Sequence, residues 1–85
     1  MSARKVVIYI TDWCPYCTRA RDLLEAKGIA AAEIDVEAVP GAFEEMRARS
    51  GRDTVPQIFI GERHVGGSDE LHALDADGTL DEMLK

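Results

Sequence analysis

The chain has 85 residues, of which 46% are hydrophobic, and this size and composition predict one small folded domain over residues 1–85. Its net charge of −6 argues against nucleic acid or an anionic membrane as the main partner. No apolar run approaches the roughly 20 residues that a membrane-spanning helix needs, and the chain leads into its first strand without the apolar core of a secretion signal. These features predict a cytoplasmic protein.

The first part of the chain alternates between predicted strands and helices. Residues 5–10 form a nearly continuous apolar run rich in β-branched side chains, which is typical of a strand buried on both faces. Residues 15–27 have the spacing of an amphipathic helix. Pro15 fits its first turn, where a missing N–H costs nothing, and Gly28 is expected to end it. Loosely alternating residues 32–36 predict a second strand.

A second helix and a hairpin are predicted next. The helix covers residues 41–50 and ends at Gly51. Residues 57–60 and 63–65 predict two strands joined by a tight turn. A third helix begins after the glycine pair with Ser68 as its N-cap.

Residues 79–85 should form a last helical turn or two, with Thr79 as the cap. The resulting order βαβαββα predicts an α/β fold, with a mixed sheet that carries helices on both faces.

The two cysteines, Cys14 and Cys17, lie three residues apart between the first strand and the first helix. A thiol at that junction faces the unpaired N–H groups and the positive end of the helix dipole, which stabilise a thiolate and lower its pKa. So short a loop gains little stability from a disulfide, so the pair is expected to react. Cys14, nearer the helix start, is expected to have the exposed sulfur and to attack, while Cys17 is shielded and resolves the intermediate.

An alternative interpretation of the cysteine pair is that it supplies two of the ligands of a zinc site. Zinc needs about four nitrogen or sulfur ligands, and His64 and His72 lack the paired spacing of a zinc module. Both histidines are expected on solvated faces, and no metal is predicted. The acidic residues near the C-terminus are likewise expected to form a solvated surface; they are Asp75, Asp77, Asp81 and Glu82.

Three motifs together resemble a known family. They are Cys14-Pro15-Tyr16-Cys17, Thr54-Val55-Pro56 and Gly66-Gly67-Ser68-Asp69. In this order, and in a chain of this length, they resemble the small bacterial dithiol glutaredoxins of the glutaredoxin 3 type over essentially the whole chain. The resemblance implies a thioredoxin fold with a four-stranded mixed sheet, with glutathione as a co-substrate and no permanently bound cofactor.

Each of the other two motifs has two interpretations. Pro56 at a strand start is also compatible with an edge position, whereas the resemblance implies a cis-proline packed against the active disulfide. Val55 would then pair its backbone with a peptide-like ligand, and Thr54 would flank that contact. The glycine-rich motif is also compatible with a plain turn and helix cap. By the resemblance, Gly67, Ser68 and Asp69 hold the γ-glutamyl end of glutathione, and Tyr16 packs beside the mixed disulfide.

One position departs from the family pattern. Members usually carry a lysine three residues before the first cysteine, and here that residue is Thr11, followed by Asp12 and Trp13. The departure removes a positive charge that would bind glutathione and support the thiolate. Candidates to replace it are Arg52, Arg47 and Arg49. Trp13 is interpreted either as an exposed rim of the site or as a contact for protein substrates.

The sequence therefore predicts a glutathione-dependent thiol–disulfide oxidoreductase. Its expected partners are glutathione and disulfide-containing or glutathionylated proteins, with ribonucleotide reductase as one candidate, and it is expected to act as a monomer. One alternative is a redoxin coupled to thioredoxin reductase. Another is an iron–sulfur carrier in which Cys14 of two subunits and two glutathiones hold a cluster, which Pro15 argues against.

Overall fold

A computed structural model describes residues 5–84 of the chain. Its helices and strands, in chain order, are β1 (Val6–Ile10), α1 (Pro15–Ala26), β2 (Ala32–Asp35), α2 (Ala42–Ser50), β3 (Gln57–Ile60), β4 (Arg63–Gly66), α3 (Ser68–Ala76) and α4 (Thr79–Met83). Every predicted element is present, with bounds that differ by one or two residues at most ends. None of the helices in the described part of the chain is long and apolar enough to cross a membrane.

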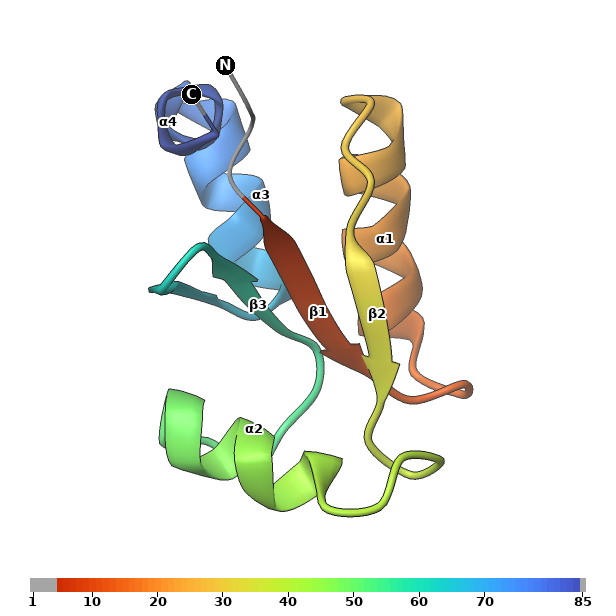
Figure 1. The fold of residues 1–85 in the computed structure, drawn as a ribbon. Coiled ribbons are helices and arrows are strands. Elements are labelled where there is room, and N and C mark those ends of the chain that lie inside the picture. The colour runs from red at the N-terminus through yellow and green to blue at the C-terminus, as the bar shows by residue number, and fades with distance from the viewer. Residues whose placement is uncertain (1–4, 85) are drawn as a thin grey trace.

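The four strands form one sheet in the order β2-β1-β3-β4 (Figure 1). β1 pairs in parallel with β2, antiparallel pairing joins β1 to β3, and the hairpin partner β4 completes the sheet. β1 is therefore a central strand, which explains its run of β-branched residues. The parallel pair is connected through α1, and the later strands form a hairpin. This mixed sheet with its helical crossovers confirms the predicted thioredoxin fold.

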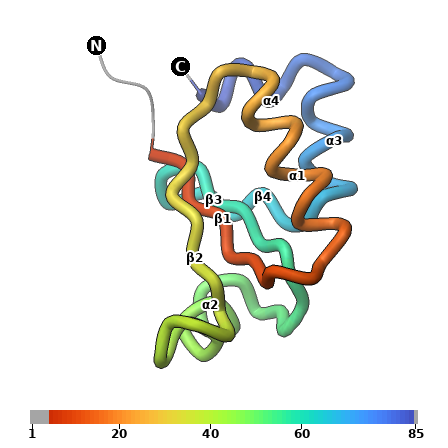
Figure 2. The backbone as a smooth tube through the Cα atoms, turned by 90° about the vertical axis from the view of Figure 1, so that its right-hand side faces the viewer, coloured from red at the N-terminus to blue at the C-terminus, as the bar shows by residue number. Residues whose placement is uncertain are grey.

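Helices cover both faces of the sheet, as predicted (Figure 2). On one face, residues of α1, α3 and α4 pack against β1 and β3 around Ile8, Ile58 and Leu71, each fully buried. On the other face, α2 contributes Met46 to a smaller cluster with Tyr9 and Phe59 of the sheet. The ends of β1 and β3 are thus held from both sides, which fixes the loops that follow β1 and precede β3.

The predicted helix caps need two corrections. Gly67, not Ser68, is the N-cap of α3, because the Glu70 carboxylate reaches back and accepts the Gly67 N–H at 2.6 Å. Gly78 precedes α4 at its N-cap, and the Thr79 N–H donates to the Asp77 carboxylate at 2.9 Å. In both cases an acidic side chain does the capping that a hydroxyl was expected to do. The last predicted helical residue, Lys85, lies outside the described residues.

The acidic surface near the C-terminus is also more structured than predicted. Asp75 is half-buried, and both Asp75 and Asp81 form ion pairs with Lys27, at 2.8 Å and 3.0 Å from its Nζ. These carboxylates raise the pKa of Lys27 above its usual value. The contacts tie the C-terminal end of α1 to α3 and α4, on the side of the molecule away from the cysteines.

Candidate active site

Cys14 is the N-cap of α1, with extended backbone angles of φ −88° and ψ 115°. Its Sγ accepts the N–H of Cys17 at 3.2 Å, so the sulfur takes the place that a serine or aspartate oxygen has in an ordinary cap. Pro15 follows in the first turn, as predicted. A sulfur in this position receives an N–H donor and lies at the positive end of the helix dipole.

The exposure of the cysteines differs from the prediction. Cys14 is 5% exposed and Cys17 is 0% exposed, so Cys14 is the more accessible of the two but does not present an open sulfur. The cause is the loop before β3, because the Val55 carbonyl lies 3.7 Å from Cys14 Sγ and accepts its S–H. A substrate sulfur must therefore approach along the hollows beside Cys14.

Burial sets the protonation of Cys17. Removal of this thiol from water raises its pKa to about 12, with a further contribution from its interaction with Cys14 and a small opposing one from the Thr11 backbone. The second thiol thus keeps its proton at neutral pH. The pair is asymmetric: one sulfur caps a helix, and the other is enclosed by the core.

The loop that carries Thr54-Val55-Pro56 crosses directly in front of Cys14. Its Val55-Pro56 peptide bond is cis, as the resemblance implied. Pro56 is buried, and its carbonyl would lie 3.4 Å from a Cβ placed on Gly67. A Cβ at position 67 would be in van der Waals contact with this carbonyl, so α3 begins directly beside the proline loop.

Gln57 supports this loop, and the sequence analysis missed it. The side chain is 1% exposed, and its Nε2 donates to the Thr54 carbonyl at 3.0 Å and to Thr54 Oγ1 at 3.3 Å. Its Oε1 lies 2.7 Å from His64 Nε2, so the arrangement makes His64 the donor. The available signal was a polar residue at the start of an otherwise apolar buried strand.

His64 is correspondingly not on a solvated face. Its ring stacks on Phe59 with centroids 4.9 Å apart, and burial lowers its pKa below the usual value. His72 is also half-buried, because its Nδ1 lies 2.8 Å from the Ser68 carbonyl one helical turn back. The expectation of two solvated histidines is wrong in both cases, since each ring packs over a neighbouring backbone or ring.

The predicted glutathione residues meet at one hollow of about 400 Å³, which we call the α3 hollow. All seven line it: Tyr16, Thr54, Val55, Pro56, Gly67, Ser68 and Asp69. They come from the first turn of α1, the loop before β3 and the first turn of α3. The N–H groups in the first turn of α3 have no acceptor within their helix, so this hollow offers hydrogen-bond donors to a carboxylate.

The three candidate cations differ in where they lie. Arg52 lines the α3 hollow, where its guanidinium pairs with Glu70 at 3.2 Å. Arg49 packs on the sheet face instead, with Nη1 donating to the Tyr9 hydroxyl at 2.9 Å and the guanidinium 4.1 Å above the Phe59 ring. Arg47 lies against Phe43. Of the three, Arg52 is the one at the hollow.

Comparisons with known proteins decide the family. A family model described as glutaredoxin matches residues 6–65. Glutaredoxin 3 of Escherichia coli K12 is 52% identical over 80 residues, which cover 94% of this chain and 96% of that protein. The chain belongs to the glutaredoxin family. Membership implies thiol–disulfide oxidoreductase activity, and glutaredoxins use glutathione as a substrate.

Solved glutaredoxin structures share the fold. The solution structure of glutaredoxin from Brucella melitensis superposes with a TM-score of 0.87 at 53% identity, covering 100% of this chain and 92% of that one. A buckwheat glutaredoxin–glutathione complex superposes with a TM-score of 0.87 at 28% identity, covering 95% of this chain and 76% of that one. The thioredoxin-fold resemblance inferred from the three motifs is confirmed.

Thr11 marks where this glutaredoxin departs from its family pattern. The residue is 4% exposed, and among the side chains of residues 5–84 its Oγ1 is a buried polar atom without a hydrogen-bond partner. A buried unpaired hydroxyl costs about 1–3 kcal/mol relative to a paired one. Thr11 therefore neither supplies the missing charge nor makes a hydrogen bond in its place.

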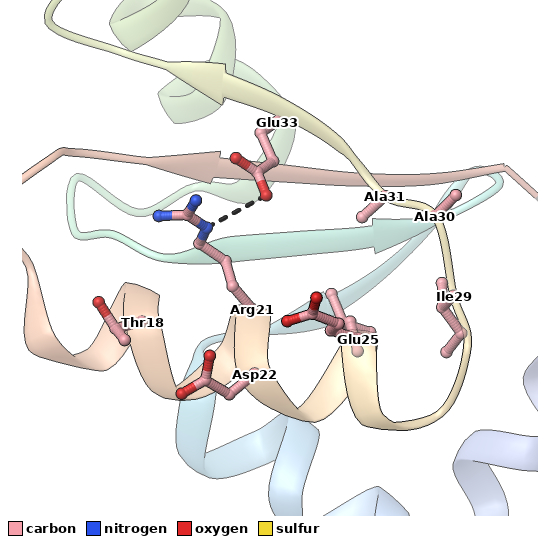
Figure 3. Close-up of a pocket in the computed structure, with 9 residues that line it drawn as sticks. Thr18, Arg21, Asp22, Glu25, Ile29, Ala30, Ala31 and Glu33 are labelled. Atoms are coloured by element: carbon pink, nitrogen blue, oxygen red, sulfur yellow. Dashed lines mark hydrogen bonds and ion pairs between the residues drawn. The ribbon is translucent and has the colours of Figure 1, made fainter.

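Some hollows of this glutaredoxin are lined by neither cysteine. Figure 3 shows one of about 430 Å³ between α1 and the start of β2, where Arg21 donates to Glu33 at 3.1 Å. None of the predicted site residues lines it. Within residues 5–84, no group of three or more histidine, cysteine, aspartate and glutamate side chains is arranged to hold a metal ion.

Proposed function

We propose that this glutaredoxin reduces protein disulfides and protein–glutathione mixed disulfides, with glutathione as the reductant and the cysteine pair as the redox centre. The observation that carries the proposal is the position of Cys14 Sγ. It caps α1 and lies 3.7 Å from the carbonyl of Val55, which lines the α3 hollow together with Tyr16 and the first turn of α3. The nucleophile and a site with the chemistry for a glutathione molecule therefore adjoin each other.

The proposed reaction begins with attack by the Cys14 thiolate. Its electron pair forms a bond to one sulfur of the substrate disulfide, and the other sulfur leaves as a thiolate that takes a proton from water. With a glutathionylated protein, glutathione remains on Cys14 and the protein thiol is released. A second glutathione thiolate then attacks the glutathione sulfur, which regenerates Cys14 and yields oxidised glutathione.

Protein disulfides use Cys17 in addition. After attack by Cys14, the mixed disulfide with the protein is resolved by Cys17, and two glutathiones later reduce the Cys14–Cys17 disulfide. Because the pKa of Cys17 is about 12, this thiol does not compete as a nucleophile in the free enzyme. Cys17 must lose its proton as it attacks Cys14 Sγ; the bond between Cys14 and the protein sulfur then breaks, and the protein sulfur leaves as a thiolate.

Glutathione is proposed to lie in the α3 hollow as an extended peptide. Its γ-glutamyl carboxylate would accept N–H groups from the first turn of α3, where Gly67 permits close approach, and Asp69 would take the ammonium. Val55 would pair with the cysteinyl backbone, flanked by Thr54 and Pro56, and Tyr16 would cover the mixed disulfide. Arg52 would attract a carboxylate of glutathione in place of the lysine that Thr11 replaces. The structural similarity to a buckwheat glutaredoxin–glutathione complex supports glutathione as the ligand.

We further propose that residues 1–85 act as one domain and as a cytoplasmic monomer without a permanent cofactor. Its partners would be disulfide-containing or glutathionylated proteins, with ribonucleotide reductase as one candidate. The negative net charge supports the exclusion of nucleic acid and of membranes.

The direct test is glutathione-dependent reduction of a small mixed disulfide, coupled to glutathione reductase so that oxidised glutathione is measured. We expect turnover by the wild-type protein and none by Cys14→Ser. Absence of turnover in the wild-type protein, with free thiols confirmed by titration, would overturn the proposal.

A second candidate is reduction by thioredoxin reductase. Two observations favour it: Thr11 supplies no cation, and Trp13, directly before Cys14, is 69% exposed where a protein partner can contact it. Turnover with NADPH and thioredoxin reductase in the absence of glutathione would support this route. If the rate with thioredoxin reductase is lower than the rate with glutathione by about a hundredfold or more, glutathione remains the reductant.

A further inference from the structure

A second hollow, of about 510 Å³, lies beside Cys14 and extends from residues of the proposed glutathione site to Trp13. It shares Tyr16, Thr54 and Val55 with the α3 hollow, and Cys14 itself lines it. We call it the Trp13 groove. Its other lining residues come from the end of β1, the turn after β2, the start of α2 and the residue before Thr54; they are Thr11, Trp13, Pro15, Val36, Glu37, Phe43 and Asp53.

The walls of the Trp13 groove are apolar. Trp13, Val36, Phe43 and Val55 supply them, and Trp13 is among the few large hydrophobic side chains of the described chain that are exposed, at 69%. The indole is held in place, since its Nε1 donates to Glu37 at 3.1 Å. A fixed, exposed aromatic ring next to a reactive sulfur is a surface that gains free energy when an apolar side chain covers it.

The backbone beneath the groove is also fixed. The Asp35 carboxylate accepts the N–H groups of Glu37 at 2.9 Å and Ala38 at 3.2 Å, which closes the turn after β2. The Val36 N–H continues the pairing to Ile10 at 3.0 Å. The groove is therefore preformed, and a ligand need not order this turn to bind.

The charges at the groove have one sign. Glu37 and Asp53 line it, and Asp12 lies between Thr11 and Trp13 in the sequence. No lysine or arginine lines the groove. Within residues 5–84, neither Glu37 nor Asp53 forms an ion pair. Thr11 occupies the position where the family usually has a lysine. Because threonine is neutral, it does not offset the negative charges of the groove. A cationic ligand is therefore favoured here, and an acidic one is repelled.

We propose that the Trp13 groove binds the polypeptide segment beside the reactive cysteine of a protein substrate, and that it selects segments with an apolar side chain flanked by lysine or arginine. The inference rests on the proposed function, because the segment is held while its cysteine is bonded to Cys14. Each hollow then binds a different substrate: glutathione binds in the α3 hollow, and the protein segment binds in the Trp13 groove.

A thiol exchange on Cys14 tests this selectivity in the Cys17→Ser background. The glutathione adduct of Cys14 is mixed with a short peptide that carries one cysteine. The peptide thiolate attacks Cys14 Sγ, the bond to the glutathione sulfur breaks, and glutathione leaves as a thiolate, with no net oxidation. Intact mass gives the equilibrium ratio of the two adducts. The same exchange of each peptide with oxidised glutathione in solution corrects for differences in thiol pKa.

Three peptides carry the comparison: one with leucine and two arginines near the cysteine, one with leucine and two glutamates, and one with serine and two arginines. At low salt we expect the first to be favoured over the second by about two- to fivefold, since a rim ion pair is worth up to about 1 kcal/mol. High salt should reduce that preference. We expect the first to be favoured over the third by about threefold or more, because leucine covers the indole.

Two variants assign the preferences to the groove. Glu37→Gln combined with Asp53→Asn should abolish the preference for arginine over glutamate, while Glu25→Gln, at the hollow of Figure 3, should leave it unchanged. Trp13→Ala, at an exposed position, should reduce the preference for leucine over serine. Equal binding of all three peptides to the starting protein would overturn the inference, and so would a charge preference that survives in the double carboxylate variant. Failure of Cys14 to form the glutathione adduct would instead count against the proposed function.

Discussion

The N-termini of α1 and α3 lie beside the same hollow but use their unpaired N–H groups differently. In α1, the Cys17 N–H donates to Cys14 Sγ, so this helix end is capped by a reactive side chain of the protein itself. In α3, the cap residue is a glycine, and the Glu70 carboxylate takes only the Gly67 N–H. Ser68 and Asp69 line the hollow, and their first-turn N–H groups have no acceptor within the helix. One helix end therefore prepares the nucleophile, and the other is suited to hold a substrate anion.

The largest expected effect comes from removing the sulfur that caps α1. Cys14→Ser should lower both deglutathionylation and disulfide reduction by more than about a hundredfold, because a hydroxyl is no nucleophile towards disulfides at neutral pH. The serine hydroxyl can still cap the helix, so the thermal midpoint should stay close to that of the wild-type protein. Coupled turnover and circular dichroism measure the two quantities. Retained activity would mean that Cys17 can attack without its partner.

Replacing the enclosed sulfur should separate the two activities. Cys17→Ser is expected to keep most of the deglutathionylation rate, since a second glutathione can resolve the adduct on Cys14, and to lose reduction of protein disulfides. The measurement compares a glutathionylated peptide with a peptide disulfide under the same reductant. Equal loss of both activities would contradict the assignment of Cys14 as attacking and Cys17 as resolving.

A change at the α3 end should affect the binding of glutathione rather than the chemistry. The Asp69 carboxylate is 89% exposed, so water screens its contact with an ammonium. For Asp69→Ala we therefore expect an increase in KM for glutathione of about three- to tenfold, with little change in kcat. Arg19→Ala, which removes the guanidinium 4.0 Å from Asp69, is the matched control and should not raise KM. An unchanged KM in Asp69→Ala would remove this residue from the site.

The cap of α3 should show in the pH dependence of stability. Arg52 and the Gly67 N–H hold the pKa of the Glu70 carboxyl below its usual value of 4.5. The ionised carboxylate therefore stabilises the folded state fully above that value, and the contribution is lost as pH falls through the lower folded pKa. Glu70→Gln should cost below about 1 kcal/mol at neutral pH, given the exposed pair. In urea titrations this difference should shrink as pH falls below 4.5 and through the lower pKa of the folded state. A difference independent of pH would contradict the charge-based cap.

The smallest expected effect is at Thr11. Valine has nearly the same shape and removes the buried hydroxyl that has no partner, so Thr11→Val should leave stability unchanged or raise it by about 1 kcal/mol. Chemical denaturation measures this change. A loss of stability above about 1 kcal/mol would mean that the hydroxyl is satisfied in solution.

The sequence was sufficient for the elements and for the residues that meet at the α3 hollow, because these follow from periodicity, turn residues and three short motifs. It was insufficient where long-range contacts decide. The Cys14 sulfur is covered because Val55, 41 positions away, packs over it. Gln57 and His64 support the loop through a hydrogen bond between β3 and β4. At α3, the hydrogen bond from the Gly67 N–H to the Glu70 side chain makes Gly67, not Ser68, the N-cap. Local pattern carries no signal for such contacts.

The central claim is that Cys14 is the sulfur that bonds glutathione, at the junction of the two helix ends. The most direct test is the intact mass of Cys17→Ser after incubation with oxidised glutathione, with a peptide map to locate the adduct. We expect one glutathione, on Cys14. In Cys14→Ser, where only the enclosed thiol remains, we expect none. A glutathione adduct on Cys17 in Cys14→Ser at a comparable rate, or no adduct on Cys14 in Cys17→Ser, would contradict the account.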